Sequence, residues 1–228
     1  MVELCDQGMC GCPSECLLHG KEITNMTIQL HGVPGTRSTR AAWLLEELSV
    51  PYVQHAIQFG AGEHKQSQHL TRQPHGLVPA IDLGHGPMIE SAAMCLAIAD
   101  QYADKGLAPA LGSPDRARYY EAIVYAVSTV DEAVIPMYLH TKVLPPSQRD
   151  PKVIEAKMPT WKIAAELLTK RLGARPFIVG DTFTAADIVV GYDLILALEI
   201  GLLASYPELT AYAKRLIERP TFHKVFPS

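Results

Sequence analysis

The sequence predicts a small α/β domain followed by an all-α domain. Two patterns carry this prediction. Segments that alternate polar and apolar residues, as half-buried strands do, fall between residues 27 and 89. From residue 114 onward the apolar residues recur at helical spacing, and Phe177-Ile178-Val179 is the one strand-like exception. A chain of 228 residues fits one large domain or two small ones, because a domain usually takes roughly 100–200 residues.

The composition and charge exclude several classes of protein. Hydrophobic residues make up 48% and charged residues 19%, a globular balance that excludes disorder, collagen-like repeats and long coiled coils. The 20 Lys and Arg against 24 Asp and Glu give a formal charge of −4, and no basic run stands out, so neither nucleic acid nor an anionic membrane is expected as a partner. The most apolar stretch, residues 188–203, contains Asp193 and Glu199 and predicts a buried core helix rather than a membrane span. The N-terminus carries no export or transit pattern, so the expected location is cytoplasmic.

Four of the five cysteines lie within the first sixteen residues, at Cys5, Cys10, Cys12 and Cys16. Zinc sites usually pair two short Cys-Cys halves across a folded spacer, and this cluster has neither a second half nor a spacer. The surrounding glycines and the missing periodicity predict that residues 1–26 form a flexible extension with reduced thiols. No metal site is therefore expected, and metal binding by the cluster is the alternative left open.

Residues 27–103 alternate between strand and helix signals. Strands are expected at 27–31, 52–58, 77–83 and 88–89, and helices at 40–48 and from 90 to about 102. Thr36, Ser38 and Thr39 are candidate N-caps of the first helix. The two leading β–α units predict parallel pairing across a crossover. Pro79 lies at the opening of the third strand, although a proline cannot donate a hydrogen bond to a neighbouring strand.

A linker is expected over residues 104–113, which are rich in glycine and proline. Residues 114–228 are then expected to form the helical domain, with helices from 114 to about 140, from 152 to about 172, from 185 to about 203 and at 209–218. Thr184 and Asp187 have the spacing of a capping box, which indicates a stabilising role and no catalytic one.

This order of elements, with a proline opening the third strand, resembles the thioredoxin-like plan, in which that proline is usually cis. With an all-helical domain after it, the chain resembles a cytosolic glutathione S-transferase with a serine/threonine-type active site. The resemblance covers roughly residues 27–227 and rests on four segments: Pro34-Gly35-Thr36-Arg37-Ser38, Leu77-Val78-Pro79-Ala80, Glu90-Ser91 and the stretch from Phe177 to Asp187.

The resemblance implies glutathione as a ligand, and helix termini give a physical reason. A helix N-terminus attracts carboxylates, so the amide and hydroxyl of Ser91 are expected to hold the γ-glutamyl carboxylate, with Glu90 facing the ammonium group. A cis bond before Pro79 turns the backbone of Val78 outward, where an extended cysteinyl peptide can pair with it. The alternatives are a simple capping pair at Glu90-Ser91 and an edge-strand proline at Pro79.

A hydroxyl that donates to the glutathione sulfur favours the thiolate and lowers the pKa of the thiol. In the family this donor follows the first strand, and between Gly32 and Ala42 there is neither a tyrosine nor a cysteine. Thr36 is the expected donor, Ser38 is the second choice, and simple N-capping is the structural alternative.

Two further sets of residues are candidates for contacts with the substrates. Leu77 stands where many members have a basic residue for the glycyl carboxylate, so that contact is expected from one of four polar residues: His75, Gln73, Lys65 or His64. The pocket for the electrophile is expected between the Pro34–Thr36 turn and the first long helix of the second domain, where tyrosines recur at Tyr119, Tyr120, Tyr125 and Tyr138. Aromatic residues at helical spacing are also typical of a packed core.

The resemblance implies a transferase that conjugates the thiolate of glutathione to small hydrophobic electrophiles, as in detoxification. It also implies a homodimer, and no cofactor is expected besides glutathione, which acts as a co-substrate. A glutathione-dependent isomerase or dehalogenase is one alternative, and a non-catalytic binding or dimerisation module is the other.

Overall fold

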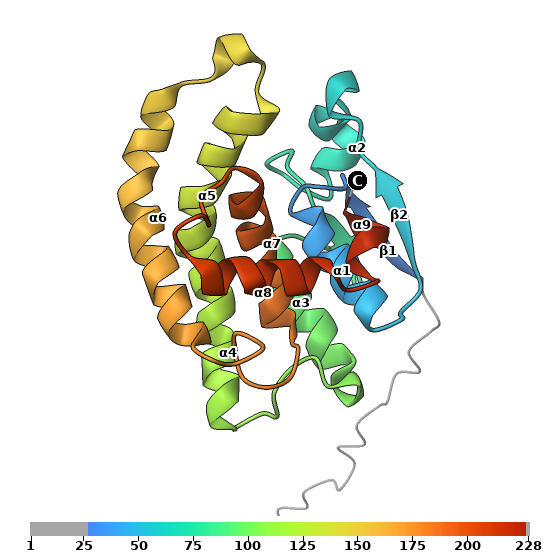
Figure 1. Cartoon of the computed structure of the whole chain (residues 1–228). Helices are drawn as coiled ribbons and strands as arrows, with labels where there is room; N and C mark the ends of the chain where they lie inside the picture. The colour runs from blue at the N-terminus through green and yellow to red at the C-terminus, as the bar shows by residue number, and fades with distance from the viewer. Residues whose placement is uncertain (1–26, 227–228) are drawn as a thin grey trace, which may run out of the picture.

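The computed structural model describes residues 27–226, and the cysteine cluster of the first sixteen residues lies outside this range (Figure 1). The described chain contains a small four-stranded sheet and is otherwise mostly helical. Its strands are β1 (Ile28–Gly32), β2 (Tyr52–Ala56), β3 (Ala80–Asp82) and β4 (Pro87–Met88). Its α-helices are α1 (Ser38–Glu47), α2 (Ser67–Leu70), α3 (Ser91–Gln101), α4 (Pro114–Tyr125), α5 (Asp131–Tyr138), α6 (Pro151–Leu172), α7 (Ala185–Glu199), α8 (Pro207–Ile217) and α9 (Phe222–Val225).

The sheet has the order β2-β1-β3-β4. β1 pairs with β2 in parallel, as the two leading β–α units predicted, and β3 is antiparallel to both β1 and β4. Because side chains alternate across a strand, Ile28, Leu30 and Ile81 are buried on the face that packs with α1 and α3. The predicted fold class, a thioredoxin-like α/β unit with an all-α unit after it, is confirmed.

The third strand is shorter than predicted, because it begins at Ala80 rather than at residue 77. The Val78–Pro79 peptide is cis, as the resemblance implied, and Pro79 has no N–H to donate, so regular pairing starts only after it. The expected strands at 52–58 and 88–89 also differ slightly, and lie at Tyr52–Ala56 and Pro87–Met88.

The first helix lacks the side-chain cap that the hydroxyl residues suggested. Its N-cap residue is Arg37, and no side chain caps it. The hydroxyls of Ser38 and Thr39 accept instead from the Val33 and Gly35 N–H groups, at 3.2 and 2.9 Å. These hydroxyls therefore fix the turn before the helix rather than the first turn of the helix itself.

The helical part surrounds α7, whose residues from Ala185 to Ala197 are all buried. Against it pack α8 and the helices α4 and α5, which π-helical turns join into one helix from Pro114 to Val143, while α6 lies on the outer side of α5 and also contacts α8 (Figure 1). This 30-residue helix meets the length and composition criterion for crossing a membrane, as core helices of soluble proteins also do. The capping box at the start of α7 is confirmed, because Thr184 N donates to Asp187 at 2.8 Å and the Thr184 side chain receives the N3 amide.

Candidate active site

The turn after β1 carries the neighbouring hydroxyls of Thr36 and Ser38. The Thr36 hydroxyl donates to the Val33 carbonyl at 2.6 Å and lies 3.0 Å from the Ser38 hydroxyl oxygen. Thr36 is half-buried, whereas Ser38 is 1% exposed. Gly32 makes this packing possible, because a Cβ at that position would lie 2.3 Å from the Ser38 hydroxyl oxygen. Of the two predicted donors, Thr36 is therefore the one that a ligand can reach.

The turn with the cis peptide at Pro79 lies beside the turn that carries Thr36 and Ser38. β1 and β3 are antiparallel with His31 opposite Ala80, so the chain leaving β1 and the Val78–Pro79 peptide entering β3 meet at the same end of the sheet. Within residues 27–226, neither the N–H nor the C=O of Val78 has a hydrogen-bond partner. Both groups are thus available for an extended peptide.

The N-terminus of α3 supplies the third element. Ser91 begins the helix and is 5% exposed, while Glu90 precedes it with a φ of 71°, a left-handed conformation that is uncommon outside glycine. Strain of this kind at a residue with a charged side chain is typical of functional sites. The Glu90 carbonyl accepts from Met94, which leaves the first amides of α3 free.

A buried ionic cluster connects these elements, and sequence reasoning missed it. Arg40 on α1 is fully buried; it donates to Asp131 at 2.6 Å, to Asp193 at 2.8 Å and to the Ser91 hydroxyl at 3.4 Å. Arg37 donates to the same Asp131 at 2.7 Å. The cluster thus joins the α/β unit to α5 and α7, and it contacts the serine at the start of α3. Asp193 inside an apolar stretch was the one visible signal in the sequence.

The two carboxylates of this cluster differ in pKa. Burial disfavours the charged form of Asp131, but the hydrogen bond with Asp193 and the charge of Arg40 lower the pKa of Asp131 to about 2. Burial raises the pKa of Asp193 well above its usual value, although Arg40 opposes this shift. Asp131 is thus the anionic partner of Arg40, and Asp193 is the acid more readily protonated.

The helical part also contacts the turn that carries Thr36 and Ser38. The Tyr192 hydroxyl on α7 donates to the Gly35 carbonyl at 3.0 Å, and the Arg40 guanidinium lies 4.7 Å from the centre of the Tyr192 ring. Burial raises the pKa of Tyr192, so this hydroxyl keeps its proton for the hydrogen bond.

The four candidates for the glycyl carboxylate lie just before the cis-proline turn, but in different roles. Gln73 is buried and accepts from His75 N at 2.8 Å, so it holds its own loop. Lys65 is exposed and donates to the His75 carbonyl at 3.0 Å. His64 and Lys65 both pack against Gly76, where a Cβ would lie 2.6 Å from the His64 carbonyl.

The predicted tyrosine lining of the electrophile pocket needs one correction. Tyr119 is fully buried beneath Arg116 and belongs to the core, so it cannot line an accessible pocket. The Tyr125 ring packs under Arg171 of α6, and the Tyr138 hydroxyl donates to Glu199 at 2.9 Å. Tyr120 is 39% exposed. Helical spacing did not separate core tyrosines from surface ones.

No group of three or more His, Cys, Asp or Glu with metal-binding geometry occurs in residues 27–226.

The sheet, the cis-proline turn and the helical part define a class of protein: a thioredoxin-like domain joined to an all-α domain. Two family models match the chain. That of the glutathione S-transferase N-terminal domain matches residues 26–100, and that of the glutathione S-transferase C-terminal domain matches residues 132–220.

Individual relatives agree with these matches. Glutathione S-transferase 1 of Zea mays is 29% identical over 196 residues, which cover 82% of this chain and 89% of the relative. A solved structure of glutathione S-transferase-I bound with lactoylglutathione has a TM-score of 0.75 and 27% identity, and the match covers 88% of this chain and 98% of that one. Elongation factor 1-gamma of Prunus avium is 26% identical over 211 residues, 88% of this chain but 48% of that protein. The chain belongs to the glutathione S-transferase family.

Proposed function

We propose that the protein is a glutathione transferase that conjugates the thiolate of glutathione to small hydrophobic electrophiles. The observation that carries this proposal is the meeting of three features at one end of the sheet: the accessible Thr36 hydroxyl, the unpaired backbone of Val78 at the cis peptide, and the N-terminus of α3 at Ser91. The names of the transferase relatives support it.

In the proposed complex, each feature holds one part of glutathione. The amide and hydroxyl of Ser91 take the γ-glutamyl carboxylate, and Arg40 at 3.4 Å from that hydroxyl adds positive charge. Glu90 faces the γ-glutamyl ammonium. The N–H and C=O of Val78, held outward by the cis bond to Pro79, pair with the cysteinyl residue.

Thr36 then donates to the glutathione sulfur. Its hydroxyl is now directed at the Val33 carbonyl, and a hydroxyl rotates readily to a stronger acceptor such as a thiolate. The Ser38 N–H lies 3.3 Å from the Thr36 hydroxyl oxygen, and the Ser38 hydroxyl lies 3.0 Å from it, so both can donate to Thr36 while Thr36 donates to sulfur. This arrangement supports Thr36 as the proposed catalytic hydroxyl, with Ser38 as its hydrogen-bond partner.

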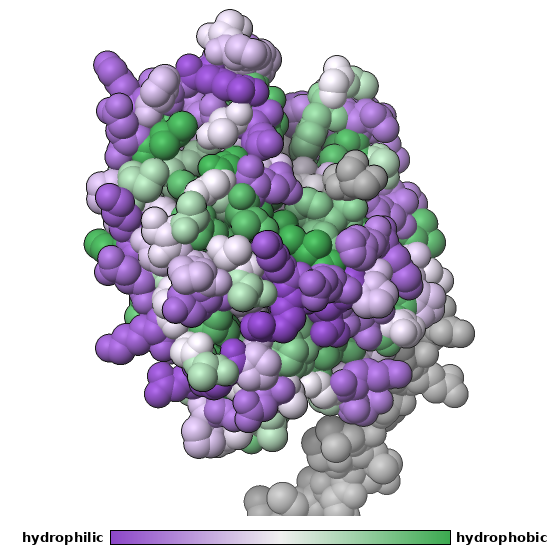
Figure 2. All heavy atoms as spheres, viewed as in Figure 1, coloured by the Kyte–Doolittle hydropathy of each residue, from purple (hydrophilic) through white to green (hydrophobic). Residues whose placement is uncertain are grey.

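The electrophile is proposed to bind on the helical side of this turn. Figure 2 shows hydrophobic side chains gathered in the notch between the helical domain and the α2 side of the molecule. The last turns of the Pro114–Val143 helix expose Leu139 and Val143. We also propose a homodimer, a cytoplasmic location, a role in detoxification, and no bound cofactor, metal, nucleic acid or membrane.

The test is the pKa of the glutathione thiol when bound, measured from thiolate absorbance against pH. A charge-assisted hydrogen bond contributes about 1.5–3 kcal/mol, which corresponds to a pKa lowered by about 1–2 units. Thr36→Ala should return the pKa toward that of free glutathione, Thr36→Ser should retain the lowered value, and Ser38→Ala should give a smaller loss. A bound thiol with an ordinary pKa in the wild-type protein would refute the proposal.

The second candidate is a non-catalytic binding module, which the similarity to elongation factor 1-gamma favours. A module of this kind needs no thiolate. It predicts that glutathione is not bound, or is bound with an unchanged thiol pKa, and the same titration therefore separates the two functions.

A further inference from the structure

The face of the sheet beneath α2 is hollow and polar, unlike the apolar face beneath α1 and α3. A cavity of about 590 Å³ separates this face from α2 and the short helical turns before it. Strand alternation and register place Gln29 and His31 of β1, His55 of β2 and Asp82 of β3 on its floor. His55 is exposed and Gln29 and His31 are half-buried, so this polar floor is open to solvent and to a small ligand.

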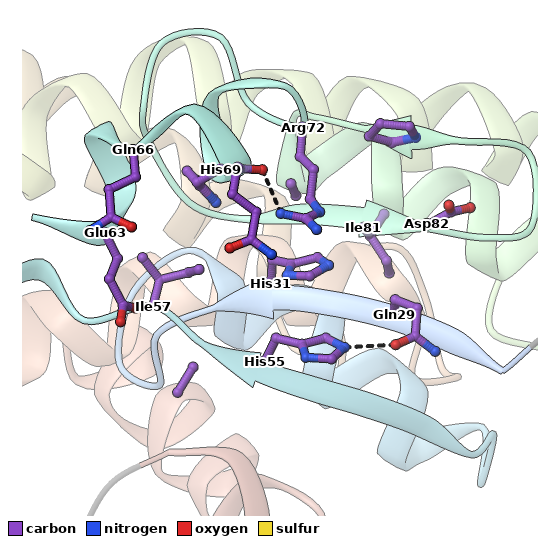
Figure 3. A pocket seen from close by; sticks show the side chains of 14 residues that line it. Gln29, His31, His55, Ile57, Glu63, Gln66, His69, Arg72, Ile81 and Asp82 are labelled. Carbon is purple, nitrogen blue, oxygen red and sulfur yellow. Dashed lines mark hydrogen bonds between the residues drawn. The ribbon is translucent and has the colours of Figure 1, made fainter.

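Arg72 supplies the charge of this cavity. It follows α2 and reaches down toward the His31 ring (Figure 3). Among residues 27–226, its side chain has one partner, the Gln68 carbonyl at 2.6 Å, and no carboxylate within ion-pair distance. The other N–H groups of its planar guanidinium are therefore free, and their geometry matches two oxygens of a carboxylate or phosphate.

The two acids that line the cavity are already engaged elsewhere. One oxygen of Asp82 accepts from the backbone of Gly84 and Gly86, at 2.7 and 3.1 Å. Glu63 accepts from the Gln58 N–H at 2.8 Å. One oxygen of each carboxylate is thus held by loop amides, and neither carboxylate forms an ion pair with the guanidinium of Arg72 within residues 27–226.

Three histidines complete the lining. The rings of His31 and His55 stack with centroids 4.5 Å apart, and His55 Nε2 lies 2.7 Å from the side-chain oxygen of Gln29 (Figure 3). His69 on α2 bonds the Leu77 carbonyl at 2.7 Å, and its other ring nitrogen is buried without a partner. Burial, then the charges of Arg72, His55 and His69, lower the pKa of His31 to about 4, and Asp82 opposes them only in part. Arg72 thus supplies the permanent positive charge beside His31.

We propose that this cavity is a second binding site, which takes a small ligand with a carboxylate or phosphate group. The guanidinium of Arg72 binds two oxygens of the ligand, and the anion lies close to the ring of His31. None of the residues assigned above to glutathione lines the cavity, so this site does not depend on the transferase function.

The experiment follows the histidine ring resonances of the full chain by NMR during titration with inorganic phosphate, with succinate, and with chloride at equal ionic strength. Phosphate or succinate should shift the resonances saturably and raise the pKa of His31, whereas chloride should not. Stronger binding of phosphate identifies a phosphate ligand, and stronger binding of succinate identifies a carboxylate ligand. If neither anion acts differently from chloride, the proposal is wrong.

Variants locate the binding. Arg72→Gln should weaken the preferred anion about tenfold or more, because a charge-assisted bidentate contact is lost. The matched control is Arg118→Gln, which removes an arginine whose side chain is 71% exposed. Ser91→Ala tests the α3 N-terminus. Binding that falls with Ser91→Ala and persists with Arg72→Gln would place the anion at the glutathione site and overturn the proposal. Glutathione binding by Arg72→Gln should remain unchanged.

Discussion

Replacing Asp131 by asparagine should destabilise the fold, and more than replacing Asp193 by asparagine does. Asp131 is 3% exposed and accepts from Arg37 at 2.7 Å and from Arg40 at 2.6 and 3.2 Å. The fall of its pKa from 3.8 to about 2 favours the charged form by roughly 2–3 kcal/mol. Breaking a buried pair by removing one partner costs about 3–5 kcal/mol. We therefore expect Asp131→Asn to lower the free energy of unfolding by about 3 kcal/mol at pH 7.

Urea denaturation followed by tryptophan fluorescence measures this loss, since Trp43 and Trp161 are both buried. Protein concentration must be fixed, because oligomers gain stability with concentration. The folded-state pKa of Asp131 is depressed, so its contribution is complete above the unfolded-state pKa near 4 and disappears as the pH falls toward 2. The gap between wild type and variant should therefore close over that range.

Two variants make the prediction refutable. Asp193→Asn should cost much less, because the pKa of Asp193 is raised and an amide resembles its protonated form. Asp104→Asn, at an exposed position, is the matched control and should leave the midpoint unchanged. If Asp131→Asn shifts the midpoint no more than Asp104→Asn does, the argument from buried charge is wrong.

Three further changes test the packing around the site. Asp187→Ala removes the acceptor of four hydrogen bonds at the start of α7 and should destabilise the fold by about 2–4 kcal/mol in the same denaturation assay, while a value below about 1 kcal/mol would contradict its structural role. Gly32→Ala places a Cβ 2.3 Å from the Ser38 hydroxyl oxygen and should lower the free energy of unfolding by about 1–3 kcal/mol. It should also raise the pKa of the bound glutathione thiol, and an unchanged pKa would show that Ser38 does not influence the thiol. Tyr192→Phe frees the Gly35 carbonyl and should lower kcat/KM about three- to tenfold with the fold intact by circular dichroism, and a wild-type value would show that this contact does not position the turn.

Local patterns were sufficient for much of the fold. The period of hydrophobic residues located the strands and helices, but the predicted start of the third strand at residue 77 was wrong, because Pro79 prevents regular pairing before Ala80. The capping box was predicted because Thr184 and Asp187 are three residues apart, and a side chain reaches that distance along one turn. The N-cap of the first helix was not predicted correctly, because the hydroxyls of Ser38 and Thr39 accept hydrogen bonds from the preceding turn rather than from the helix.

The sequence by itself determined the order of elements and the capping box at Thr184 and Asp187, because each depends on neighbours within a few residues, whereas the resemblance to a family supplied the cis-proline turn and the choice of Thr36. Only the tertiary structure decided that Thr36 is accessible and Ser38 is not, and that Tyr119 belongs to the core. It also decided that Arg40 pairs with acids 91 and 153 residues away. Burial and ion pairing of this kind depend on which distant segments pack together, and the spacing of residues along the chain does not contain that information.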